Sequence, residues 1–169
     1  MIAYKFLRPE GISVFTGFRW PLPDGGPGAW VDGRVDPCRS GIHACRPSDL
    51  PLWVGHVLYE IELDGEIVEQ PSKVVAPRGR LTRRVEPWDG ELRDAYTRMC
   101  ADRAHELAGG ASPPLEHWEV VVEPSVPEGP ALLGFVAARI AEEISGAEAY
   151  REERASQTEW LVERVGLDA

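Results

Sequence analysis

The segment Asp36–Cys45 concentrates the side chains most capable of chemistry. It reads Asp-Pro-Cys-Arg-Ser-Gly-Ile-His-Ala-Cys and holds two of the three cysteines and one of the four histidines of this 169-residue chain. If its end is extended, His43 and Cys45 lie on one face, because successive side chains of a strand alternate. An imidazole can give or take a proton near neutral pH, and a thiol beside it can act as a nucleophile or a supporting group. His43 and Cys45 are therefore the candidate catalytic pair, although no complete catalytic signature is present.

The same residues permit a zinc site. Cys38, His43 and Cys45, with His56 as a fourth ligand, supply the thiolates and imidazoles that zinc prefers in tetrahedral sites. Their spacing, Cys-x4-His-x-Cys-x10-His, matches none of the standard zinc-binding patterns. Zinc is therefore not the favoured interpretation, and the sequence identifies no other cofactor. A third interpretation needs no site, because free cysteine is among the most buried residue types and Cys45 can be a core residue.

A second candidate is the basic segment from Lys73 to Arg84, which contains five positive residues and no acid. If residues 80–85 form a strand, Arg80, Thr82 and Arg84 share a face, and two guanidinium groups so placed can hold a phosphate or carboxylate. Trp30 and Trp88 can line the rim of a pocket and stack on a ligand, although packing in the core is the favoured interpretation of these tryptophans. The alternative is a solvated strand face that acidic helices neutralise.

The first half of the chain, residues 1–87, has the composition of short strands separated by turns. It is rich in glycine, proline, tryptophan and β-branched residues,. The alternation of apolar side chains predicts a strand over residues 12–20, and further strands are expected over 57–63, 66–69, 74–76 and 80–85. Asp64-Gly65 predicts a type I′ hairpin turn that pairs 57–63 with 66–69, because this dipeptide accepts positive φ at both central positions.

The second half, residues 88–169, is rich in helix formers. Asp89 predicts the N-cap of a helix that Gly109-Gly110 ends, and residues 118–122 predict a short extended segment. Pro130 predicts the first turn of a second helix. The apolar stripe expected to be buried on it consists of Leu132, Leu133, Val136, Ile140 and Ile144. After Ser145-Gly146, a charged helix over 147–165 is expected, with Glu153 among its exposed residues.

Strands first and helices afterwards predict an α+β fold. We expect one domain over residues 1–169, in which the helices of the second half pack on one face of a largely antiparallel sheet. A chain of 169 residues with 43% hydrophobic content is long enough for one buried core,.

The charge and the apolar runs restrict the partners. A formal net charge of −10 argues against binding to nucleic acid or to an anionic membrane, because long-range repulsion opposes the approach,. No apolar run approaches the roughly 20 residues that span a bilayer, and no signal-peptide pattern is present, so we expect a cytoplasmic protein. In that reducing compartment the three cysteines are expected to be thiols,.

The first half resembles an uncharacterised bacterial and phage domain family. The resemblance covers about residues 1–85 and rests on Cys38-x-x-Gly-Ile-His-Ala-Cys45, on Leu58–Ile67 and on Lys73–Ala76. It implies no established activity. A fainter similarity to ADP-ribosyltransferase folds rests on Glu60-x-Glu62, while the Ser-x-Ser motif of those enzymes has no clear counterpart.

These observations leave several functional hypotheses. In the leading hypothesis, the protein binds a small anionic metabolite or nucleotide in a pocket between His43 and the strand bearing Arg80 and Arg84. As an enzyme, it would also transform this ligand there. The competing class is a non-enzymatic interaction module, in which Leu161 and Val165 of the C-terminal helix dock a partner or a second copy as a homodimer. An ADP-ribosyltransferase-like enzyme and a zinc-stabilised domain are further alternatives.

Overall fold

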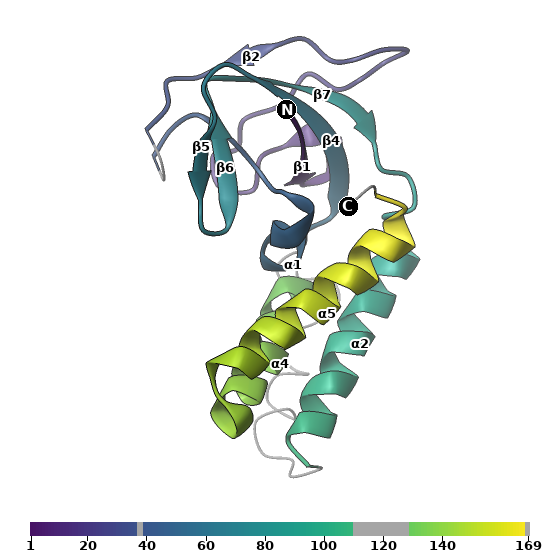
Figure 1. Ribbon diagram of the computed structural model, residues 1–169. Coiled ribbons are helices and arrows are strands. Elements are labelled where there is room, and N and C mark those ends of the chain that lie inside the picture. The colour runs from purple at the N-terminus through teal and green to yellow at the C-terminus, as the bar shows by residue number, and fades with distance from the viewer. Residues whose placement is uncertain (37–38, 110–128, 168–169) are drawn as a thin grey trace.

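Two antiparallel sheets and a set of helices make up the computed structural model, which describes residues 1–36, 39–109 and 129–167 (Figure 1). The strands are β1 (Ile2–Leu7), β2 (Val31–Asp32), β3 (Ile42–Ala44), β4 (Val57–Asp64), β5 (Val68–Gln70), β6 (Lys73–Ala76) and β7 (Arg78–Arg84). The helices are η1 (Pro9–Gly11), η2 (Pro47–Asp49), α1 (Leu50–Trp53), α2 (Gly90–Leu107), α4 (Gly129–Ser145) and α5 (Ala147–Val165). The predicted α+β class is confirmed.

The larger sheet has the strand order β1-β4-β7-β2, and the smaller has the order β3-β6-β5. The two sheets meet at β1, because Tyr4 and Cys45 exchange two backbone hydrogen bonds of 2.8 and 2.7 Å. Side chains from both sheets then share one apolar core, which includes Leu7, Ile42, Ala44, Ile61, Val74, Ala76 and Leu81. This junction places the end of β3 beside β1.

The predicted hairpin at Asp64-Gly65 is wrong. β4 pairs with β1 and β7, whereas β5 pairs with β6 in the other sheet. Gly65 has a φ of 88°, but Asp64 does not have the positive φ that a type I′ turn needs at both positions,. Because β1 and β7 occupy both edges of β4 over long registers, the chain crosses to the second sheet at Gly65 instead of folding back.

The strand predicted over residues 12–20 is also wrong. Ile12 forms only isolated bridges with Arg8 and Arg19. The segment between is a compact turn, in which the Ser13 amide donates to the Phe18 carbonyl at 2.8 Å and Gly17 takes a φ of 68°. The turn leaves Phe15 83% exposed.

Helices α2, α4 and α5 lie side by side below the sheets in Figure 1. The predicted N-cap of α2 is confirmed, since Asp89 Oδ1 accepts a hydrogen bond from the Leu92 amide at 2.8 Å. Gly109, with a φ of 64°, follows the end of this helix. The extended segment predicted over 118–122 lies outside the described residues.

The buried face of α4 differs from the predicted stripe. Leu133 is buried as expected, but the other buried side chains are small, Ala137, Ala138 and Ala141, whereas Ile144 is 60% exposed. Gly134 explains the shift, because a Cβ added to it would lie 3.0 Å from Tyr96 of α2 and 3.0 Å from Gln157 of α5. The three helices meet here so closely that small residues must face inward.

Glu153 of α5, predicted to be exposed, is buried in this contact. Its carboxylate accepts hydrogen bonds from Arg103 of α2 at 2.9 Å and from Gln157 at 3.0 Å. Gln157 in turn donates to the Gly134 carbonyl at 3.0 Å. Because the Glu153 carboxylate accepts two hydrogen bonds, one of them from an arginine, the charge is tolerated inside the helical layer,.

A second core joins the helices to the sheets. An aromatic series crosses the boundary, with ring centroids 5.7 Å apart for Phe6 and Trp88, 6.4 Å for Trp88 and Tyr96, and 5.6 Å for Tyr96 and Trp160. Leu161 and Val165 are buried in the same core. The partner-docking face predicted for these two residues is therefore already occupied by the chain itself. Within the described part of the chain, no helix is both long enough and apolar enough to cross a bilayer.

Substituting Leu161→Ala tests this core. Leu161 is only 2% exposed, so the substitution leaves a cavity and should lower the free energy of unfolding by about 2–4 kcal/mol,. Urea denaturation measures the change. Glu152→Ala, on the exposed side of the same helix, is the control and should stay within about 0.5 kcal/mol of the parent,. Equal effects of the two substitutions would contradict the assignment.

Candidate functional site

His43 is the central residue of β3 and lies opposite Val75 of β6. Its ring is half-buried, and Nε2 is hidden from solvent and has no hydrogen-bond partner among the described residues. Burial lowers the pKa of the imidazole, and the charges of Lys73 and Lys5 lower it further. A hydrogen bond with the Ser40 backbone raises the pKa but does not outweigh these effects. His43 is therefore a neutral imidazole at pH 7 with an unused polar atom.

Lys5 reaches His43 from β1. Its Nζ donates a hydrogen bond of 2.6 Å to the His43 carbonyl and lies 5.2 Å from the centroid of the Trp20 ring. Burial lowers the pKa of Lys5 to about 8, with the charge of Lys73 adding to this shift and Cys45 opposing it. The position follows from the sheet junction, which sets β3 alongside β1.

Lys73 is the first residue of β6, the strand that pairs with β3. Its Nζ lies 5.6 Å from the centroid of the Trp53 ring, and its charge acts on His43, Lys5 and Cys45. In the part of the chain that the structure describes, neither lysine forms an ion pair with a carboxylate. We call the group of Lys5, His43, Cys45 and Lys73 the two-lysine site.

Cys45 contributes a thiol to this site but not a thiolate. The residue is 6% exposed, and burial raises its pKa to about 12, although Lys5 and Lys73 act in the opposite direction. A thiol with this pKa stays protonated at neutral pH. The structure therefore gives no support to the predicted nucleophilic role of Cys45.

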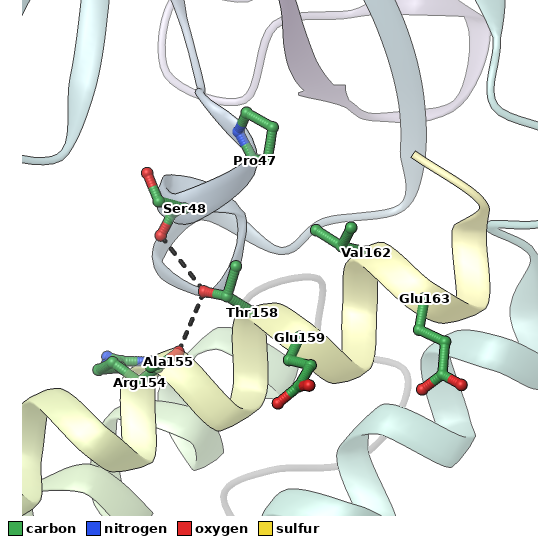
Figure 2. Close-up of a pocket in the computed structure, with 8 residues that line it drawn as sticks. All are labelled: Pro47, Ser48, Arg154, Ala155, Thr158, Glu159, Val162 and Glu163. Atoms are coloured by element: carbon green, nitrogen blue, oxygen red, sulfur yellow. Dashed lines mark hydrogen bonds between the residues drawn. The ribbon is translucent and has the colours of Figure 1, made fainter. Parts of the chain in front are cut away.

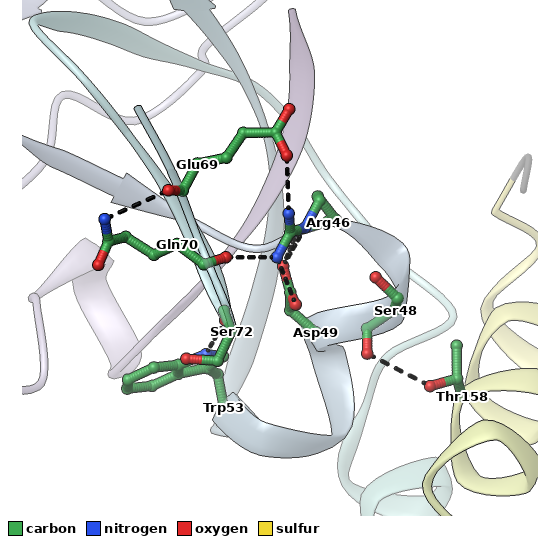
Figure 3. A network of polar contacts seen from close by, with 8 residues as sticks. All are labelled: Arg46, Ser48, Asp49, Trp53, Glu69, Gln70, Ser72 and Thr158. Carbon is green, nitrogen blue, oxygen red and sulfur yellow. Dashed lines mark hydrogen bonds and ion pairs between the residues drawn. The ribbon is translucent and has the colours of Figure 1, made fainter. Parts of the chain in front are cut away.

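A partly buried ion pair joins Arg46, which follows Cys45 in the chain, to Asp49 (Figure 3). Arg46 Nε and Nη2 donate to the two carboxylate oxygens of Asp49 at 2.8 and 3.1 Å, and Nη2 also donates to the Gln70 carbonyl at 2.8 Å. Trp53 Nε1 donates to the Ser72 carbonyl at 2.6 Å. These contacts fix the segment before β6, and so they position Trp53 and Lys73.

The arginines predicted to clamp an anion are engaged elsewhere. Arg80 contacts the Glu62 carboxylate at 2.7 Å and Thr82 donates to Glu60 at 2.6 Å, while Arg84 lies 3.5 Å from Glu86. Carboxylates of β4 lie opposite the cations of β7, so the predicted clamp is already neutralised. The same contacts engage both acids of the Glu60-x-Glu62 motif.

The two tryptophans assigned to a pocket rim have different positions. Trp88 is 0% exposed and donates to the Gly55 carbonyl at 2.9 Å, so its predicted place at a rim is wrong. Trp30 is half-buried, and the guanidinium carbons of Arg78 and Arg80 each lie 4.6 Å from its ring centroid. It packs on arginines of β7 rather than near His43.

The zinc hypothesis receives no support from the described residues. They contain no group of three or more His, Cys, Asp or Glu side chains that could hold a metal ion. His56 Nδ1 lies 3.1 Å from Arg93 Nη1 of α2. Cys38, the first of the proposed ligands, lies outside the described residues.

A groove of about 740 Å³ lies between η2 and α5 (Figure 2). Pro47 and Ser48 form one wall, and Thr158 and Val162 belong to the other. Thr158 Oγ1 donates to the Ser48 carbonyl at 3.5 Å across it. The lining contains neither His43 nor a lysine, so this groove is separate from the two-lysine site.

Comparison with protein-family models, with curated proteins and with solved structures found no match to this chain. The resemblance of its first half to the bacterial and phage domain family therefore remains a prediction. The geometry of the site is the basis for any functional inference.

No motif of the sequence distinguishes Lys5, and Lys73 stands out only as the start of the basic segment. A signal was available, because Lys5 and Lys73 are the only two lysines among the 18 Lys and Arg residues of the chain. Lysine is a compact cation whose pKa shifts readily on burial, so the two side chains are not equivalent to arginines.

The lowered pKa of Lys5 predicts a pH dependence. Folded Lys5 releases its proton near pH 8, whereas the unfolded chain keeps it to about pH 10.4,. Between these values the unfolded state binds more protons, so stability from this residue rises with pH. The difference in free energy of unfolding between the parent and Lys5→Met should therefore shift by about 1–3 kcal/mol in favour of the parent from pH 8 to 10.

Denaturation by urea at several pH values measures this difference. Cys45 is present in both proteins, so the opposite effect of its raised pKa largely cancels. A difference that stays constant with pH would show that Lys5 keeps an ordinary pKa in the folded protein.

Proposed function

We propose that the protein binds a small organic anion, a metabolite or nucleotide with a carboxylate or phosphate group, at the two-lysine site. The observation that carries this proposal is the position of both lysines beside β3, since Lys5 donates to the His43 carbonyl and Lys73 begins the paired strand β6, and neither has a carboxylate partner among the described residues. The leading hypothesis is thus retained at His43, but Lys5 and Lys73 replace Arg80 and Arg84 as the cations.

Electrostatics supports an anionic ligand. Two like charges in a partly buried setting repel each other, which is one reason for the lowered pKa of Lys5,. An anion between them would relieve this repulsion and supply the missing opposite charge. Partial burial strengthens that attraction, because fewer water molecules screen it.

His43 adds a directed polar contact. Its hydrogen bond with the Ser40 backbone raises the pKa of the ring, as donation from a ring N–H does, so in the neutral ring the unpartnered Nε2 is the acceptor nitrogen,. A ligand hydroxyl or N–H group that donates to Nε2 would satisfy this buried atom, which otherwise costs free energy. The imidazole thus favours a ligand that carries a hydrogen-bond donor beside its anionic group.

Aromatic side chains beside the lysines support an organic ligand. Phe15 contacts the edge of Trp53 with ring centroids 6.2 Å apart, and Phe18 contacts Trp20 in the same way at 5.7 Å. Both phenylalanines are exposed. Rings in this position can cover the carbon part of a small ligand. The net charge of −10 disfavours a large polyanion and so favours a small one,.

Titration with inorganic phosphate, a nucleoside monophosphate and simple carboxylates tests the proposal, with calorimetry or thermal unfolding as the readout. We expect at least one probe to bind, and Lys73→Gln to weaken binding at least about tenfold, the effect of losing about 1.4 kcal/mol from a charged contact. Arg98→Gln removes the same charge from an exposed position on α2 and should leave binding unchanged. Failure of every probe, or equal losses in the two variants, would exclude an anion site here.

A further inference from the structure

We infer that Lys5 captures an aldehyde or α-keto acid as a reversible imine while Lys73 holds the carboxylate of the same ligand. This inference rests on the proposed function, because it assigns the anion at the two-lysine site to a particular chemical class. It adds a covalent step to binding and gives the two lysines different roles.

The surroundings of Lys5 are those of a reactive amine. Its Nζ donates to the His43 carbonyl at 2.6 Å and lies 5.2 Å from the centroid of the Trp20 ring. Neither neighbour carries a negative charge that would stabilise an ammonium ion as a carboxylate does. Partial burial and a nearby second cation are the two features that activate lysines for imine formation.

The surroundings of Lys5 lower its pKa and so increase the fraction of the neutral amine. Only the neutral amine has the lone pair needed to attack a carbonyl carbon. With a pKa of about 8, Lys5 is neutral in about one molecule in ten at pH 7, whereas an ordinary lysine is neutral in fewer than about one in a thousand,. The reactive form of Lys5 is therefore on the order of 100-fold more abundant.

The step balances without any other reactant. The Nζ lone pair forms a bond to the carbonyl carbon, and the carbonyl π electrons move to oxygen, which takes up one proton from the nitrogen. Loss of the second N–H proton and of the hydroxyl group as water then gives the imine. Addition of water reverses the reaction and releases the ligand.

Lys73 suits the second role. It is the first residue of β6, the strand that pairs with β3, and its charge acts on both Lys5 and His43. A carboxylate next to the carbonyl carbon would lie between the two lysines, and its attraction to Lys73 would orient the carbonyl toward Lys5. The protonated, buried Cys45 does not compete for the carbonyl, because a thiol adds as the thiolate,.

Reductive trapping tests the inference on the full chain. Glyoxylate and sodium cyanoborohydride convert any imine into a stable amine, and peptide mass spectrometry separates labelling at Lys5 from labelling at Lys73. In the folded protein at pH 7, we expect Lys5 to be labelled at least about tenfold faster than Lys73. In concentrated urea the two rates should become equal.

Formaldehyde is the matched probe, because it forms an imine but has no carboxylate. Lys73→Gln raises the pKa of Lys5 and so slows its labelling by both probes, but only glyoxylate also loses a carboxylate contact. The labelling of Lys5 by glyoxylate should therefore slow more than its labelling by formaldehyde. Equal labelling of both lysines in the folded protein would overturn the inference, and so would equal slowing of the two probes in Lys73→Gln.

Inorganic phosphate separates this inference from the proposed function. It has no carbonyl carbon, so its binding to the parent protein measures the anion site without the imine. Anion binding by the parent without preferential labelling of Lys5 would overturn the imine and leave the anion site standing. Absence of anion binding would instead overturn the proposed function.

Discussion

The pair of backbone hydrogen bonds between Tyr4 and Cys45 is the contact on which the arrangement of this protein depends. It joins the edge of the larger sheet to the end of β3, so that segments about forty residues apart in sequence run side by side. His43 precedes Cys45 by two residues and Lys5 follows Tyr4, and the junction therefore brings the Lys5 amine within hydrogen-bond distance of the His43 backbone carbonyl. Without it, β3 would be a short edge strand with no means of positioning a functional group.

Charge is distributed in two different ways over the sheets. The arginines of β7 lie opposite Glu60 and Glu62 of β4, and these pairs largely cancel each other's charge. The two lysines lie on other strands, beside aromatic rings and without such partners among the described residues. A cation without a nearby carboxylate gains most from a bound anion. The two lysines are therefore better candidates for an anion site than the arginines of β7, which already face carboxylates.

The helical half acts on the sheets through one continuous core. Aromatic rings form a series from β1 to α5 across the boundary, and Trp88 donates a hydrogen bond to the Gly55 carbonyl. Farther from the sheets, the helices approach each other at Gly134, where small side chains and a satisfied polar network replace large apolar residues. The C-terminal helix is thus a structural element of this chain, and the site lies on the sheets that it helps to support.

The sequence by itself determined the α+β class, the ends of the helices and the extent of several strands. Asp89 and Gly109 mark the limits of α2, because capping and positive φ are properties of single residues and their neighbours,. The tertiary structure alone decided which strands pair, which acids face Arg80 and Arg84, and that Lys5 reaches the His43 carbonyl. The reason is physical: strand pairing and charge compensation depend on residues far apart in the chain, and the local pattern around Asp64-Gly65 favoured a hairpin that the competing pairing of β4 with β1 and β7 excluded,.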